Sequence, residues 1–120
     1  MKKEITITLP LPPTDNHLYG QHGHIRYMTH EGKVWKEAAQ WDIKRQYKGK
    51  VKKGDVIIKE MCFFLKRRRD IQGSLKLIFD AMEGIVYEND NQIVDFRVVK
   101  AEDKENPRVE IEISIWQKKN

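Results

Sequence analysis

Residues 55–83 read DVIIKEMCFFLKRRRDIQGSLKLIFDAME, and they predict a central strand followed by an amphipathic helix. Residues 55–65 are mostly β-branched, aromatic or otherwise apolar, as in a long strand buried on both faces. Four basic residues follow, and then apolar side chains recur at i, i+3, i+4 and i+7: Leu75, Ile78, Phe79 and Met82. This spacing predicts a helix over about 71–83 that is ended by Gly84.

The segments on either side supply the rest of one α+β domain. Residues 4–9 and 109–115 alternate apolar with polar side chains, as half-buried strands do, and residues 93–99 are also strand-like. Residues 14–24 are rich in Asn, His and Gly, which predicts a loop. We therefore expect a single domain over residues 1–120, with two main helices on a mixed or antiparallel sheet.

The first of these helices is predicted between Thr29, a suitable N-cap, and about Tyr47. Its apolar side chains at helical spacing are expected to face the core: Val34, Trp35, Ala38 and Trp41. In the central strand, Phe63 and Phe64 are expected to fill the core as well.

Composition favours a soluble folded body without disulfides. Of the 120 residues, 39% are hydrophobic, 34% are charged and one is cysteine. Because Cys62 stands in an apolar run, we expect a buried thiol without a chemical role. No run approaches the roughly 18 apolar residues that span a bilayer, and no apolar signal core is visible. We expect a cytoplasmic protein.

Basic residues are gathered in two clusters, and the formal net charge is +5. Such clusters neutralise phosphates and release counterions, which makes nucleic acid the leading candidate partner. A solvated basic face is the alternative. The predicted phosphate contacts are Lys44, Arg45, Lys48, Lys50, Lys52, Lys53, Arg67, Arg68 and Arg69.

The predicted loop over 14–24 contains three of the four histidines, His17, His22 and His24. Three histidines in one loop suggest a zinc-binding site. Zinc-binding sites usually add Cys or carboxylate ligands at defined spacing, however, and no such pattern is evident here. We expect instead a polar loop that touches the DNA backbone, with Asn16 among its contacts.

Asp70, Lys76 and Asp90 follow one another in an order that suits phosphodiester hydrolysis. A strand leads through basic residues into Asp70, a helix presents Lys76, and a polar turn brings Asp90. In such sites carboxylates hold Mg²⁺, the ion activates water, and cations hold the phosphate. Taken alone, the two carboxylates are equally explained as a helix cap and an ordinary turn residue.

Five short segments occur together along nearly the whole chain: PPTDN at 12–16, THEG at 29–32, RRRD at 67–70, KLIFDA at 76–81 and NDNQIVDFRVVK at 89–100. In order and spacing they resemble the RusA family of Holliday-junction resolvases. The resemblance implies a phage- or prophage-type homodimer that nicks four-way DNA junctions symmetrically with Mg²⁺, in DNA recombination and repair. It implies catalytic roles for Asp70, Asp90 and Lys76, with both carboxylates as metal ligands.

The chain departs from the family at Gln72. The family usually reads Asp-x-Asp-Asn where residues 70–73 read DIQG, so one carboxylate is missing. A Gln carbonyl is a hard oxygen ligand, but it lacks the charge that holds Mg²⁺. Gln72 is therefore a candidate substitute ligand, and Asp80 on the same helical face is another. For Asp80, an ion pair with Lys76 at i, i+4 is the alternative.

Three functions are compatible with the sequence. The first is a Mg²⁺-dependent junction endonuclease. The second is a junction-binding protein of the same fold, in which Gln72 marks weak or lost cleavage. The third is a small RNA-binding protein, because a basic α+β domain fits that class by composition, although the aromatic strand motif of the commonest RNA-binding sheets is absent.

Overall fold

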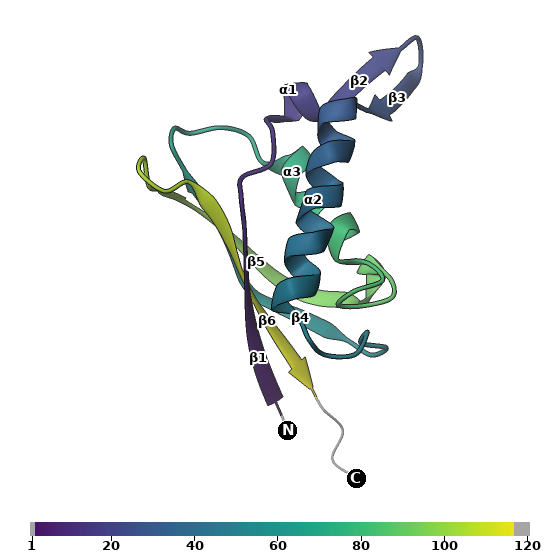
Figure 1. Cartoon of the computed structure of the whole chain (residues 1–120), viewed down its shortest axis with the longest axis vertical. Coiled ribbons are helices and arrows are strands. Elements are labelled where there is room, and N and C mark those ends of the chain that lie inside the picture. Colours follow the sequence, from purple (N-terminus) through teal and green to yellow (C-terminus); the bar gives the residue numbers. More distant parts are fainter. Residues whose placement is uncertain (1, 117–120) are drawn as a thin grey trace.

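A four-stranded sheet with two helices packed on one face forms the body of the protein, in a computed structural model that describes residues 2–116 (Figure 1). The strands of the sheet are β1 (Lys2–Leu9), β4 (Val56–Leu65), β5 (Ile93–Glu102) and β6 (Arg108–Trp116). The helices on it are α2 (His30–Gln46) and α3 (Gln72–Met82). The α+β class predicted from the sequence is confirmed.

β4 is a central strand, as predicted, in the order β1-β6-β4-β5. It runs antiparallel to β6 and parallel to β5, so the sheet is mixed. Parallel neighbours need a crossover connection, and α3 provides it between β4 and β5. Across the antiparallel pair, Ile58 lies opposite Ile113 and Phe63 opposite Val109, all four fully or almost fully buried.

β1 and β6 each bury one face, as their alternating sequences predict. Ile7 and Leu9 in β1 pack into the same core as Val109, Ile111 and Ile113 in β6. The side chain of Ile115, which continues the pattern, lies outside the described residues. This core lies on the helix side of the sheet and provides the main stabilisation, because burial of a large aliphatic side chain contributes about 1.5–3 kcal/mol.

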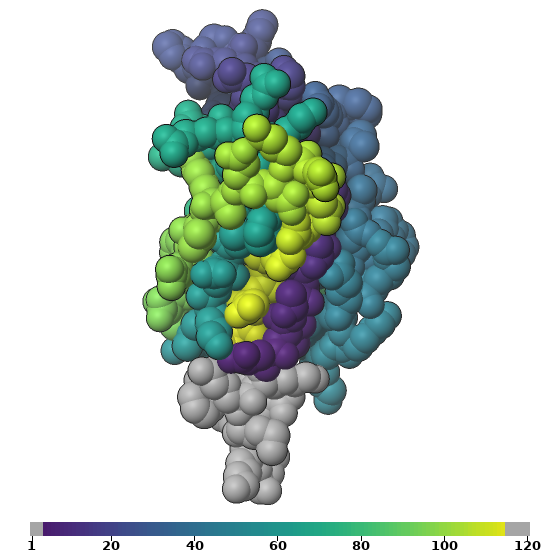
Figure 2. All heavy atoms as spheres, turned by 90° about the vertical axis from the view of Figure 1, so that its left-hand side faces the viewer, coloured from purple at the N-terminus to yellow at the C-terminus, as the bar shows by residue number. Residues whose placement is uncertain are grey.

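The opposite face of the sheet is ionic. Figure 2 looks at this face and shows β5, β4, β6 and β1 side by side. On this face Lys59 Nζ lies 3.0 Å from Glu4 Oε1, and Arg108 Nε donates a hydrogen bond to Glu110 Oε2 at 2.6 Å. Exposed ion pairs of this kind contribute about 0–1 kcal/mol each, so this face is best described as a solvated surface.

The buried side of α2 differs from the predicted one. Three of the four side chains expected in the core are exposed: Val34 (52%), Ala38 and Trp41 (63%). The side facing the core instead carries Gly32, Ala39 and Ile43, with Trp35 half-buried. Small residues occupy this side because the helix packs closely against neighbouring backbone. A Cβ on Gly32 would lie 3.0 Å from the backbone oxygen of Leu18.

The amphipathic pattern predicted for α3 is confirmed. Ile78 and Met82 are fully buried, and Leu75 and Phe79 are half-buried against the core. Gly84 follows the helix with φ +81°, a left-handed conformation that suits glycine at a helix end. No helix within residues 2–116 is both long and apolar enough to cross a membrane.

Two further expectations about single side chains are tested by burial. Cys62 is buried, as expected, and burial raises the pKa of its thiol, so it stays protonated at neutral pH. Phe63 is fully buried, whereas Phe64 is half-buried and lies under the guanidinium of Arg108, 3.9 Å from the ring centroid.

Residues 14–24, predicted as a loop, contain regular structure. The short helix α1 (Asp15–Leu18) leads into β2 (Tyr19–His22), which pairs with β3 (Ile25–Met28). This β2–β3 hairpin projects away from the main sheet (Figure 1). Its base is fixed by Thr29, the predicted N-cap of α2, whose hydroxyl accepts from Gly32 N at 3.0 Å and donates to the His17 carbonyl at 2.6 Å. The loop prediction was wrong because these short elements are held by the hydrogen bond from Thr29 to the His17 carbonyl, and Thr29 lies outside the predicted loop.

Candidate active site

Lys76 is the central cation of the polar face of α3. Its Nζ lies 3.2 Å from Asp80 Oδ1 and 3.7 Å from Asp90 Oδ2. The predicted i, i+4 ion pair with Asp80 is therefore present. The hydrogen bond to Asp80 raises the pKa of Lys76, as do the negative charges of Asp80 and Asp90. Lys76 thus remains protonated at neutral pH and acts as a fixed positive charge.

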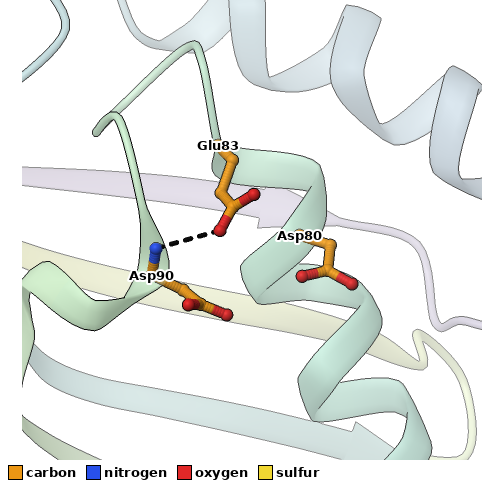
Figure 3. Close-up of side chains that lie close together, drawn as sticks. All are labelled: Asp80, Glu83 and Asp90. Carbon is orange, nitrogen blue, oxygen red and sulfur yellow. Dashed lines mark hydrogen bonds between the residues drawn. The ribbon is translucent and has the colours of Figure 1, made fainter.

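Asp80, Glu83 and Asp90 form a cluster of three carboxylates, hereafter the acidic cluster (Figure 3). One oxygen from each lies within 4.8 Å of the others, and all three residues are half-buried. Across residues 2–116, no other group of three His, Cys, Asp or Glu side chains meets this spacing. Anionic oxygens gathered in this way are the donors that Mg²⁺ and Mn²⁺ prefer.

Asp90 is brought to α3 by a tightly bonded turn. Its backbone N–H donates to Glu83 Oε1 at 2.9 Å, the bond drawn in Figure 3. Gln92 Oε1 accepts the N–H of Asn89 at 2.9 Å, while its Nε2 donates to the carbonyls of Lys52 and Gly54 at 2.8 and 2.7 Å. These bonds join the turn to the segment before β4 and hold Asp90 in place.

A cleft of about 490 Å³ lies between α3 and the β2–β3 hairpin. Gln72, Lys76 and Asp80 line it from the helix, and Arg26 and Tyr27 are among its lining residues from the hairpin. One wall thus combines a cation, a carboxylate and an amide, and the other carries a cation beside aromatic rings. This is a polar cleft able to receive a phosphate and its sugar.

Asp70 lies apart from the acidic cluster. It is exposed and lines a second hollow of about 250 Å³, together with Thr14, Asp15, Asn16 and Arg69. α3 separates the two places: Asp70 precedes the helix, whereas Asp80 and Glu83 lie near its C-terminal end. The structure therefore brings Asp90, Lys76 and Asp80 together, and it places Asp70 next to a different set of residues. Asp15 lines both the cleft and this second hollow.

Asp15 caps α3 from a distant part of the chain. Its Oδ2 accepts the N–H of Gly73 at 3.0 Å, whereas the local N-cap residue, Ile71, makes no side-chain capping bond. A Cβ on Gly73 would lie 2.9 Å from Asp15 Oδ1, so this close approach needs a residue without a side chain. The cap fixes the end of α3 that carries Gln72.

Replacing Asp15 with Ala is expected to lower the free energy of unfolding by about 1 kcal/mol, because an orphan N–H at the start of α3 loses its acceptor. Asp15→Asn keeps a side-chain oxygen and should retain most of the stability. Urea unfolding followed by circular dichroism measures both variants. Equal stability of Asp15→Ala and the wild type would show that the contact contributes nothing.

The arginine cluster divides into two exposed side chains and one structural side chain. Arg67 and Arg68 are exposed and line a groove of about 180 Å³ that also includes Lys100. Arg69 is half-buried, and its Nη2 donates to the Pro12 carbonyl at 2.6 Å. Burial lowers the pKa of Arg69. Arg69 therefore holds the segment before α1, and a phosphate contact by Arg69 remains a prediction.

The lysine-rich segment lies at the opposite end of β4 from the arginines. Residues 44–53 include the end of α2 and precede β4, whereas Arg67 lies just after the C-terminal end of β4. β4 has ten residues, so it is about 33 Å long. Arg45 forms an ion pair with Asp42, and Lys44 lies over the Trp41 ring, 5.1 Å from its centroid. The two basic clusters thus lie toward the two ends of the molecule, not on one continuous patch.

Comparison with known proteins connects this chain to one family. Residues 10–114 match the family described as endodeoxyribonuclease RusA. The chain belongs to the RusA family. The crossover junction endodeoxyribonuclease RusA of Escherichia coli strain K12 is 31% identical over 111 residues, which cover 91% of this chain and 92% of that protein.

Other RusA proteins match at similar levels. The protein of Enterobacteria phage 82 is 31% identical over 110 residues, covering 90% of this chain and 92% of its own length. That of Aquifex aeolicus is 29% identical over 112 residues, covering 91% and 87%. The family predicted from the five sequence segments is therefore confirmed, and the match includes α3, Asp70 and the acidic cluster.

Sequence reasoning missed two residues of this candidate site, Glu83 and Asp15. Glu83 follows Lys76 and Asp80 at i+7 and i+3 on one helical face, so its spacing was a usable signal. Asp15 reaches Gly73 across 58 residues, and no local pattern indicates such a contact.

Proposed function

We propose that this RusA-family chain is a Mg²⁺-dependent endonuclease that binds four-way DNA junctions and nicks two strands symmetrically, in DNA recombination and repair in the cytoplasm. The proposal rests above all on the acidic cluster with Lys76 beside it, next to an open polar cleft. Relatives that match over about nine-tenths of the chain are named crossover junction endodeoxyribonucleases. These names support four-way junction DNA as the proposed substrate.

The donor set of the acidic cluster fits Mg²⁺, because it consists of carboxylate oxygens from three half-buried side chains. Asp80, Glu83 and Asp90 would hold the ion. The family resemblance also implies Asp70, which lines the separate hollow, and Gln72 stands where the family has a carboxylate. When bound, Mg²⁺ lowers the pKa of water and stabilises the leaving oxygen of the phosphodiester. Lys76 offsets the negative charge of the scissile phosphate as it reacts.

DNA phosphates are expected to meet Arg67 and Arg68 at one end of the molecule and the lysines at the other, with Asn16 and Arg69 beside Asp70. Because the two clusters lie at opposite ends of β4 instead of forming one track, they suit two DNA arms that diverge. A linear duplex would engage one cluster at a time.

Replacing Arg68 with Ala is expected to weaken junction binding and to flatten the plot of log K against log salt by about one unit, because one phosphate contact and its counterion release are lost. Lys59→Ala is the control, since Lys59 is an exposed cation on the ionic face of the sheet. Gel-shift titrations at several salt concentrations measure both. An unchanged slope for Arg68→Ala would show that Arg68 is a solvated surface residue without a phosphate contact.

A homodimer is part of the proposal, because symmetric incision needs two sites related by a twofold axis. The free edge strand β5 supports self-association: its Val94 and Phe96 are 57% and 49% exposed. Exposed apolar side chains along an open sheet edge favour pairing with another chain. Sedimentation at micromolar concentration tests this, and a monomer both with and without junction DNA would contradict it.

Comparison of three substrates tests the function itself. A labelled four-way junction, a linear duplex of the same sequence and a structured RNA are titrated by gel shift and then incubated with and without Mg²⁺. We expect preference for the junction and paired nicks that need Mg²⁺. Tight junction binding without nicks would favour the binding-protein alternative that Gln72 raises, and equal binding to RNA would overturn the proposal.

A further inference from the structure

The β2–β3 hairpin has two chemically different faces. Its register pairs Gly20 with Tyr27 and His22 with Ile25, so these four side chains share one face, and Tyr19, Gln21, Arg26 and Met28 share the other. Tyr19, Arg26 and Met28 line the 490 Å³ cleft, and Tyr27 from the first face lines it as well. On the first face, Ile25 is 66% and Tyr27 50% exposed.

Tyr27 forms a flat platform on the first face of the hairpin. The hydroxyl end of its ring lies against Gly20, where a Cβ would stand only 2.4 Å from the ring carbon Cζ and from the hydroxyl oxygen. This end of the ring is therefore held close to the backbone of Gly20, while the residue as a whole is 50% exposed. A ring held in this way is preorganised for stacking, because little further side-chain freedom is lost on contact.

The hairpin also has the charge that DNA requires. Residues 19–28 read YGQHGHIRYM and contain no acidic residue. The Arg26 guanidinium lies over the Tyr19 ring, 4.2 Å from its centroid, and both residues line the cleft. The platform is thus continuous with the cleft that holds Lys76 and Asp80.

We propose that this hairpin recognises the branch of the junction, with Tyr27 and Ile25 contacting base pairs that lose a stacking neighbour there. In a linear duplex the base faces are covered by their neighbours, whereas at a branch point the terminal pairs expose a face. Aromatic side chains bind such faces irrespective of sequence. The inference builds on the proposed function and assigns its structural selectivity to a specific element.

A fluorescent base at the branch point tests the proposal without cleavage. A four-way junction with 2-aminopurine at the branch and a linear duplex of the same sequence are titrated in the absence of Mg²⁺. Tyr27→Ala is expected to weaken junction binding about 10-fold, the usual loss on removing one stacked aromatic ring, and to leave duplex binding unchanged. The 2-aminopurine signal that accompanies wild-type binding should be lost.

Three further variants separate stacking from other effects. Tyr27→Phe keeps the ring and should behave like the wild type. Gly20→Ala keeps Tyr27 but displaces its ring, so it should reproduce the loss. Val34→Ala removes a similarly exposed apolar side chain from α2 and should have no effect.

The possible outcomes distinguish the hairpin proposal from the proposed function. Equal losses on junction and duplex, or no loss on either, would overturn the role of the hairpin while leaving the endonuclease intact. Tyr27→Ala protein that becomes monomeric where the wild type is dimeric would also overturn it, because the platform would then contact a second copy. Wild-type protein that shows no preference for junctions would count against the proposed function instead.

Discussion

Replacing Asp90 with Asn is expected to slow Mg²⁺-dependent nicking of four-way junctions at least about 100-fold, because loss of a metal-binding carboxylate removes several kcal/mol of transition-state stabilisation. Asp90 is the residue shared by the acidic cluster and the ligand set that the family resemblance implies. Junction binding should be unchanged or slightly tighter, because one negative charge near the DNA phosphates is removed.

Single-turnover cleavage at saturating enzyme measures this effect separately from binding. Asp95→Asn is the matched control, since Asp95 is an exposed carboxylate on the following strand, β5, to which we assign no role. Asp90→Asn protein that cuts at the wild-type rate would show that the site has been misplaced.

Two companion variants identify the carboxylates that complete the site. Glu83→Gln removes a charge from the acidic cluster, and Asp70→Asn removes the acid that the resemblance names first. A strong loss with Glu83→Gln would establish the cluster as the metal site. A strong loss with Asp70→Asn alone would show that the separate hollow beside Asp15 and Asn16 takes part in the reaction.

Replacing Gln72 with Asp is expected to tighten Mg²⁺ binding and to raise the nicking rate about 10-fold at limiting metal, the usual scale for gaining or losing a residue that supports a metal site. Position 72 is exposed, lines the cleft with Lys76 and Asp80, and stands at the first residue of α3. An anion there is also favoured by the helix dipole.

Rates measured over a Mg²⁺ titration test this expectation, and Gln72→Ala is the control. If the Gln72 amide is itself a working ligand, Gln72→Ala should lower the rate while Gln72→Asp raises it. A wild-type enzyme that already cuts efficiently and an unchanged metal dependence in Gln72→Asp would refute the idea. Gly73 should be left in place, because any side chain there would meet Asp15.

The sequence predicted the parts of this protein that depend on local pattern. Strand β4, the inward stripe of α3 and the Lys76–Asp80 pair follow from residues close together in the chain. The family was predicted for a related reason, since short segments in a fixed order are visible without any knowledge of contacts. Trp41 shows the limit of this reasoning: helical spacing made it a core candidate, yet it is 63% exposed.

Composition and periodicity by themselves determined the α+β class and the amphipathic helix that carries Lys76, and the resemblance of short segments in a fixed order indicated the family. The tertiary structure alone decided which carboxylates meet, which face of α2 is buried, and that residues 19–28 form a hairpin beside the cleft. The physical reason is that these features depend on contacts between distant segments. Asp15 reaches Gly73 across 58 residues, Gln92 reaches Lys52 across 40, and Gly32 packs closely against Leu18. Side-chain periodicity records which residues prefer burial, but it carries no information on which distant backbone will lie against them.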